Sequence, residues 1–160
     1  QVISAQEYED VLHWLYDFRK GTSMHLKATC APHYYRIMRQ RAREEGVSVT
    51  PATFGMDAMT RGCLGGTGFC FISHVGQVQP CGYLTLDCGN VRTTPFPEIW
   101  RKSKPFLQFR DQSEYKGKCG VCEFHKVCGG CRARAWSMDG DYMGEEPLCT
   151  YQPRKAKEAE

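Results

Sequence analysis

Residues 119–131, CGVCEFHKVCGGC, contain two C-x-x-C pairs within thirteen positions. The two residues inside each pair form a turn that can point both thiols toward one metal centre. Two such pairs can complete a tetrahedral four-thiolate zinc site, or they can ligate iron–sulfur clusters together with thiols from other loops. Glycines between the cysteines allow backbone amides to approach the sulfur atoms. These glycines are Gly120, Gly129 and Gly130.

The remaining cysteines enlarge this pattern. The chain has 10 cysteines in 160 residues, a share below the roughly 8–10% typical of disulfide scaffolds. A chain of this length can fold without disulfide bonds. Eight of the thiols suffice for two four-thiolate sites, whereas one structural zinc would leave four unexplained. The eight are Cys63, Cys70, Cys81, Cys119, Cys122, Cys128, Cys131 and Cys149.

Composition excludes several classes of protein. Hydrophobic residues make up 41% and charged residues 24%, as in globular chains rather than disordered ones. A net charge of +3 is too small to indicate nucleic-acid binding, and no apolar run approaches the ~20 residues of a membrane span. The N-terminus has neither the basic nor the apolar region of a signal peptide. We therefore expect a cytoplasmic protein with no nucleic-acid and no membrane partner.

The first part of the chain has the pattern of an α/β protein. A capping box at Ser4 and Glu7 predicts a helix over residues 5–20. Alternation over residues 24–29 predicts a strand, and Pro32 begins a second helix that ends near residue 45. A single strand cannot pair within this segment. We therefore expect residues 1–46 to be part of something longer, and the lack of an initial Met fits a fragment.

The composition changes at Cys63, where glycine and cysteine become dense. Residues 69–73 and 77–80 are predicted to form a hairpin, and the chain between them turns at Gly76. Short helices are predicted over residues 96–102, 105–111 and 132–138, the last ending at Gly140. The predicted fold class is α+β, a small cysteine-rich domain preceded by α/β units. Its divisions are residues 1–46, a linker at 47–62, the cysteine-rich domain at 63–150 and a charged tail at 151–160.

The order and spacing of the eight cysteines resemble the SPASM domain of radical SAM enzymes. This resemblance implies two auxiliary [4Fe–4S] clusters with interleaved ligands. One departure is that two residues separate Cys128 from Cys131, where the general pattern has three. The first cluster would be held by Cys63, Cys70, Cys81 and Cys131, and the second by Cys119, Cys122, Cys128 and Cys149.

Residues 1–46 resemble the last βα units of the partial (β/α) barrel of the same enzymes. The segments ATCAPHYYRI (28–37) and CGGCRARA (128–135) resemble the heme-biosynthesis branch, which includes iron-coproporphyrin decarboxylase and the enzymes of heme d1 synthesis. The implied parent removes carbon dioxide from propionates of a heme precursor, and an auxiliary cluster accepts the surplus electron. The implied partners are the N-terminal barrel of the same polypeptide, a tetrapyrrole substrate and a protein that donates or accepts electrons.

The C-x3-C-x2-C motif that binds the cluster cleaving S-adenosylmethionine is absent. S-adenosylmethionine and a third [4Fe–4S] cluster are therefore expected only in a full-length parent, and this chain should be inactive alone. No catalytic residue can be assigned. Candidate substrate-binding residues lie at a strand-to-helix junction or could pair with carboxylates. They are Cys30, Arg36, Arg132 and Arg134, while Cys88 is expected to be a small buried hydrophobe.

Three alternatives remain open from the sequence. A zinc-binding structural or interaction module could use the same eight thiols in two four-cysteine sites. A stand-alone ferredoxin-like carrier would need no upstream barrel. Radical SAM enzymes that modify ribosomal peptides contain related segments. Iron and sulfide analysis distinguishes the zinc module from the two cluster proteins.

Overall fold

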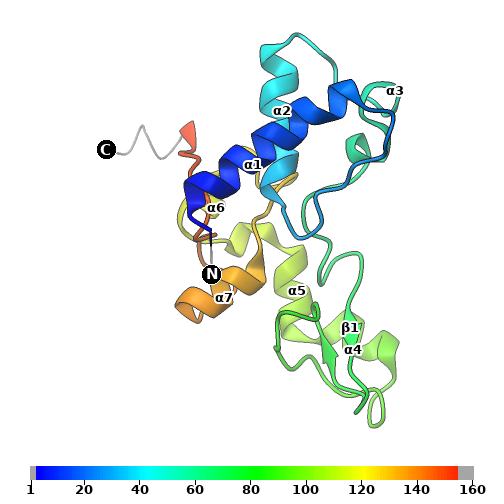
Figure 1. Ribbon diagram of the computed structural model, residues 1–160. Coiled ribbons are helices and arrows are strands. Elements are labelled where there is room, and N and C mark those ends of the chain that lie inside the picture. Colours follow the sequence, from blue (N-terminus) through cyan, green and yellow to red (C-terminus); the bar gives the residue numbers. More distant parts are fainter. Residues whose placement is uncertain (1–2, 155–160) are drawn as a thin grey trace.

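The computed structural model describes residues 3–154 and is rich in helices, with one small two-stranded sheet (Figure 1). Within these residues, no helix is long and apolar enough to cross a membrane. The helices and strands are α1 (Ala5–Phe18), α2 (His33–Glu44), α3 (Pro51–Phe54), β1 (Phe71–Ile72), β2 (Val78–Gln79), α4 (Phe96–Lys102), α5 (Lys104–Arg110), α6 (Gly117–Val121) and α7 (Arg132–Asp139).

The predicted capping box begins α1. The backbone N–H of Glu7 donates to the Ser4 hydroxyl at 3.2 Å, and the Glu7 carboxylate accepts from the Ser4 backbone N–H at 2.7 Å. Two N–H groups that a helix leaves without partners are therefore satisfied. The α-helix ends at Phe18, and a 3₁₀ turn over Arg19–Gly21 completes the predicted helical segment.

The strand predicted over residues 24–29 is wrong, because among the described residues this segment pairs with no other strand and ends in a turn at Thr29 and Cys30. A strand is defined by its hydrogen bonds to a neighbour, and in the described residues the chain brings no second extended segment alongside. The predicted second helix is confirmed as α2. The N-terminal part is therefore two helices joined by an irregular connection.

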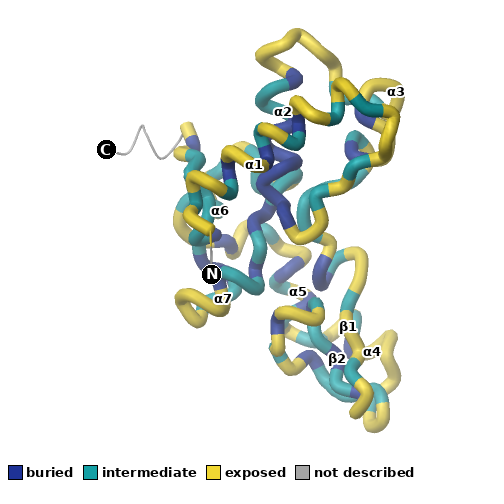
Figure 2. Tube along the Cα trace, in the orientation of Figure 1, coloured by how far each residue is buried: buried dark blue, intermediate teal, exposed yellow. Residues whose placement is uncertain are grey.

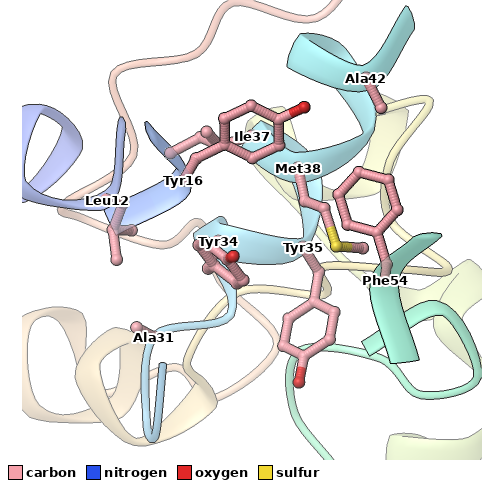
Figure 3. Close-up of a cluster of buried hydrophobic side chains, with 9 residues drawn as sticks. All are labelled: Leu12, Tyr16, Ala31, Tyr34, Tyr35, Ile37, Met38, Ala42 and Phe54. Atoms are coloured by element: carbon pink, nitrogen blue, oxygen red, sulfur yellow. The ribbon is translucent and has the colours of Figure 1, made fainter. Parts of the chain in front are cut away.

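The larger hydrophobic core lies between α1, α2 and α3. Figure 3 shows Leu12 and Tyr16 of α1 and Phe54 of α3 packed around the apolar face of α2. Phe54 lies within the segment expected to be a linker, and a capping box at Thr50 starts the short helix that carries it. Residues 47–62 therefore contribute to the core. The core residues are Leu12, Tyr16, Ala31, Tyr34, Tyr35, Ile37, Met38, Ala42 and Phe54.

The predicted hairpin and short helices are confirmed. Strands β1 and β2 pair antiparallel, with Phe71 opposite Gln79. Gly76 closes the turn at φ +84°, a conformation that L side chains rarely adopt. The hairpin and α4 lie at the opposite end of the molecule from α3 (Figure 1). A second small core there contains Val78, Cys88, Ile99 and Phe106.

A buried ion pair joins the N-terminal helices to the cysteine-rich part. The Glu146 side chain is fully buried and accepts hydrogen bonds from Arg134 of α7 at 2.8 Å and 3.0 Å. Its Oε2 atom also accepts from the backbone N–H of Cys131 at 2.5 Å. His33, the first residue of α2, lies 3.7 Å from the same oxygen. Figure 2 shows the buried start of α2 running into the middle of the molecule.

Burial and neighbouring charges determine which of Glu146, Arg134 and His33 are charged. Burial lowers the pKa of His33 to about 4, although the charge of Glu146 opposes this shift. Burial by itself raises the pKa of Glu146, but the hydrogen bond and charge of Arg134 outweigh it and hold that pKa below its usual value. At neutral pH the pair is therefore a charged carboxylate and guanidinium beside a neutral imidazole.

We predict that His33 makes the fold sensitive to mild acid. The imidazole titrates near pH 6.5 in the unfolded chain and near 4 in the folded one, so between these values the unfolded state binds more protons. The free energy of unfolding should fall by a few kcal/mol from pH 7 to 4.5, and His33→Phe should lack this part of the fall. Urea unfolding at both pH values measures it.

His25→Phe is the matched control, because His25 is exposed and its replacement should leave the acid sensitivity unchanged. If His33→Phe loses as much stability as the parent chain over the same pH range, the assignment of the acid sensitivity to His33 is wrong.

Candidate functional site

Four of the cysteines line one cavity, which we call the first cavity. They come from α6, from the loop that follows it and from the segment near the C-terminal end of the described residues. The space not filled by protein atoms is about 370 Å³, part of it open to solvent. The four are Cys119, Cys122, Cys128 and Cys149.

Hydrogen-bond donors point at the sulfur atoms of this cavity. The Phe124 N–H donates to Cys122 Sγ at 3.4 Å, and the Gly130 N–H donates to Cys128 Sγ at 3.4 Å. The Arg132 guanidinium lies 3.4 Å from Cys119 Sγ. Such donors stabilise anionic sulfur, so they favour the thiolate form that binds a metal and oppose the effect of burial on the pKa of the thiols.

The backbone at position 130, beside this cavity, has room only for a glycine. Its φ is +63°, and a Cβ there would lie 2.9 Å from Glu146 Cβ and would also clash with the Arg132 guanidinium. The same Cβ would lie 3.4 Å from Cys119 Sγ. The glycine therefore lets the backbone pass between the buried ion pair and the first cavity, as the sequence predicts for amides that approach sulfur.

Two buried polar side chains of the cavity wall have atoms without partners. Both ring nitrogens of His33 and the Nε atom of Arg36 are buried and make no hydrogen bond. Arg36 is otherwise paired with Glu9 at 2.5 Å and with Gln40 at 2.7 Å. A buried polar group without a partner costs about 1–3 kcal/mol. These orphaned atoms on a wall shared with four thiols fit an anionic metal–sulfur group in the cavity.

Burial keeps three of the metal-free thiols of the first cavity protonated, because it outweighs the N–H donors to sulfur. It raises the pKa of Cys122 to about 11 and raises that of Cys128 further. The pKa of Cys149 is also raised by burial, against the lowering effect of Arg36. Metals bind the thiolate form, so loading this site must release protons.

A second group of four thiols lines another cavity, the second cavity, with about 1080 Å³ of space that is partly open to solvent. Gly65 lies between the loops of Cys63 and Cys81, and a Cβ there would lie 3.3 Å from the Pro80 carbonyl oxygen, 3.5 Å from Cys81 Cβ and 3.6 Å from Cys63 Sγ. The exposed aromatic side chains of Phe69 and Tyr83 lie on the same wall. The four thiols are Cys30, Cys63, Cys81 and Cys131.

The second C-x-x-C pair does not face one centre. Cys128 lines the first cavity and Cys131 lines the second. Between them Gly129 and Gly130 both have positive φ, at +72° and +63°, which reverses the chain. The bond from Cys131 N–H to Glu146 then fixes the new direction. The expectation from C-x-x-C geometry alone therefore does not hold for this pair.

Cys70 is the one predicted ligand outside both cavities. It packs beside Cys88 in the small core near the hairpin. Burial alone raises the pKa of Cys70, whereas a backbone N–H opposes that effect at Cys63 and Cys81. Cys88 is buried, as predicted for a small hydrophobe.

The three candidate substrate-binding arginines make contacts inside the protein. Arg36 is paired with Glu9, and Arg134 with Glu146. Arg132 is buried and donates to the carbonyl oxygen of Gly144. Sequence reasoning missed Glu146 and His33, because a single acidic or imidazole side chain carries no spacing signal and only the tertiary contacts identify it.

Zinc ions and iron–sulfur clusters place different demands on the spacing of four thiols. Tetrahedral zinc with Zn–S bonds of about 2.3 Å needs its sulfurs within about 4 Å of one another. Within residues 3–154, no three Cys, His, Asp or Glu side chains converge closely enough to hold a metal ion. The thiols of an iron–sulfur cluster bind different irons and lie farther apart.

Comparison with known proteins agrees with this chemistry. Residues 63–132 match SPASM, an iron–sulfur cluster-binding domain. The chain is 83% identical over 155 residues to the AdoMet-dependent heme synthase of Nitratidesulfovibrio vulgaris, covering 97% of this chain and 42% of that protein. The synthase of the same name from Oleidesulfovibrio alaskensis is 77% identical over 160 residues, covering 100% of this chain and 41% of that protein.

A more distant relative has the same name. The AdoMet-dependent heme synthase of Methanosarcina barkeri is 57% identical over 153 residues, covering 96% of this chain and 44% of that protein. The chain thus spans about two fifths of the length of the curated relatives it matches. The cavities and the donors to sulfur therefore lie in a chain whose residues 63–132 match the SPASM iron–sulfur cluster-binding domain and whose sequence is closely similar to part of the AdoMet-dependent heme synthases.

Proposed function

We propose that this chain is the auxiliary-cluster part of a radical SAM heme synthase that removes carboxyl groups from propionates of an iron-coproporphyrin-type precursor. The observation that supports this most directly is the first cavity, where four thiols share a wall with N–H donors to sulfur and with orphaned polar atoms. Identities of 57–83% to heme synthases favour this substrate class over a peptide.

The proposal assigns two [4Fe–4S] clusters, one to each cavity. Cys119, Cys122, Cys128 and Cys149 hold the cluster of the first cavity. Cys63, Cys81 and Cys131 contribute to the other, with Cys70 as the fourth ligand in the assignment that follows from the sequence. Zinc in both sites is the alternative, and it would bring no sulfide with it.

A bound cluster supplies one-electron transfer at a potential set by the protein around it. Here Arg36, Lys118 and Arg132 surround the thiols of the first cavity with positive charge. Positive charge and N–H donors stabilise the reduced, more negative state and so raise the reduction potential. This environment suits a site that accepts the electron released by an oxidative decarboxylation.

The proposed domain organisation follows the sequence divisions. Residues 1–46 are the last part of a partial barrel whose earlier part lies upstream in the same polypeptide. Residues 47–62 link this barrel to residues 63–150, which hold the clusters. S-adenosylmethionine and a third cluster bind to that barrel.

The exposed Phe69 and Tyr83 beside the second cavity offer flat apolar surfaces to a tetrapyrrole. An electron-transfer protein is the remaining partner, and the reducing cytoplasm suits the free thiols.

We predict that anaerobic reconstitution of the chain yields about eight irons and eight sulfides. The double replacement of Cys119 and Cys122 by Ala should lower the iron count to about four, because it removes half of the ligands of the first cavity. Iron and sulfide assays with an electronic absorption spectrum measure both values. Cys88→Ala is the control and should keep about eight irons. Stoichiometric zinc with no sulfide would support the zinc module instead.

We predict that Gly130→Ala impairs the first site specifically. A methyl group would clash with Glu146 and Arg132 and displace the N–H that donates to Cys128 Sγ. The iron count should drop by about four, and the cluster signal should broaden. Gly140→Ala is the matched control, because its φ of +68° imposes the same backbone strain but no atom lies within 4 Å of the added methyl. Equal iron loss in both variants would contradict the steric argument.

We predict that the same double replacement of Cys119 and Cys122 reduces decarboxylation in the full-length enzyme at least tenfold. The surplus electron then has no acceptor at the first cavity. Product formation from iron-coproporphyrin, followed by chromatography, measures the change. Unchanged decarboxylation with confirmed loss of the cluster would exclude this cluster as the acceptor.

A further inference from the structure

The second cavity contains a thiol that the SPASM spacing does not include. Cys30, Cys63, Cys81 and Cys131 line it together, whereas Cys70 does not. Cys30 lies outside the segment that matches the SPASM domain, which covers residues 63–132. A four-thiolate set is therefore present at this cavity without Cys70.

The orientation of the chain explains why Cys70 is absent. Phe69 lines the second cavity, and its neighbour Cys70 starts the path into β1. Successive side chains of an extended segment point to opposite sides. With Phe69 facing the cavity, Cys70 faces the small core and packs against the group that contains Val78 and Cys88. Turning Cys70 inward would move Phe69 out of the cavity wall.

Cys30 is held at the cavity by the same ion pair that holds Cys131. The Cys30 carbonyl oxygen accepts from Arg134 Nη1 at 3.3 Å and from the Tyr8 hydroxyl at 3.5 Å. Arg134 is paired with Glu146, and Glu146 accepts from Cys131 N–H at 2.5 Å. The loop of Cys30 and the backbone of Cys131 are therefore fixed relative to each other through one buried pair.

The backbone of Cys30 has a φ angle that is unfavourable for any residue with a Cβ atom. In the described residues, Cys30 is the one non-glycine residue with positive φ, at +57°. This conformation costs an ordinary L residue about 1–2 kcal/mol. Glycine would avoid that cost, so a cysteine here is consistent with a thiol that has a role.

We propose that Cys30, rather than Cys70, is the fourth thiolate of the cluster in the second cavity. This inference rests on the proposed function and deepens it. The cluster would then be bound by three cysteines of the SPASM domain and one from the connection between α1 and α2. Loading it would fasten the N-terminal helices to the cysteine-rich domain through a covalent metal–sulfur link.

Single replacements in the whole chain, reconstituted anaerobically with iron and sulfide, test this assignment. Cys30→Gly removes the thiol and also relieves the positive φ, so the variant should fold; circular dichroism checks this. Cys70→Ala and Cys88→Ala are the matched comparisons. Iron and sulfide counts are combined with electron paramagnetic resonance spectra of the oxidised and reduced samples.

The parent chain, Cys70→Ala and Cys88→Ala should each hold about eight irons. Cys30→Gly should lose between one and four of them, because an iron without its thiolate leaves the cluster or the whole cluster is lost. A three-iron signal in the oxidised sample would mark the first case. If Cys30→Gly keeps all its irons and its spectrum, the assignment is overturned. It is equally overturned if Cys70→Ala loses them instead.

Failure of the proposed function has a different signature. In that case the parent chain itself takes up no iron and sulfide, and the variants cannot differ from it. If the parent chain binds iron and the Cys30→Gly variant binds the same amount, the proposed function is still supported. Only the assignment of Cys30 as a ligand is then wrong.

Discussion

The arrangement of both cavities depends on the buried pair of Glu146 and Arg134. A carboxylate with no exposed surface is stable only if charge and hydrogen bonds replace its lost hydration. Glu146 obtains them from the Arg134 guanidinium and from the backbone N–H groups of Cys131 and Leu148. Removing either partner would leave a buried charge unpaired, which typically costs about 3–5 kcal/mol.

This pair is also the partition between the two cavities. Glu146 lies on the wall of the first and Arg134 on the wall of the second. The chain crosses the partition between Cys128 and Cys131, where two glycines with positive φ allow it to reverse. Cysteines that are neighbours in sequence thereby line different cavities. If each cavity holds a cluster as proposed, this partition is the short protein path that electron transfer between them requires.

Much of the local structure could be predicted from the sequence, because local signals act over a few residues. The capping box at Ser4, the turn at Gly76 and the stop at Gly140 each depend on neighbours within one turn of chain. The strand over residues 24–29 failed, since alternation shows what a segment could form but not whether a partner is present. The position of Cys70 could not be predicted, because spacing does not say which side of an extended segment faces the cavity.

By itself the sequence determined the chemistry: eight thiols in an order that resembles a SPASM domain, confirmed over residues 63–132 by the family match. It also determined the short helices, whose signals, an early proline in α4 and α5 and a terminal glycine after α7, are local. Only the tertiary structure decided which thiols share a cavity, that Cys30 joins one group, and that Glu146 and His33 lie between them. The physical reason is that burial and convergence arise from contacts between segments far apart in sequence, such as Cys30 and Arg134, which no local pattern encodes.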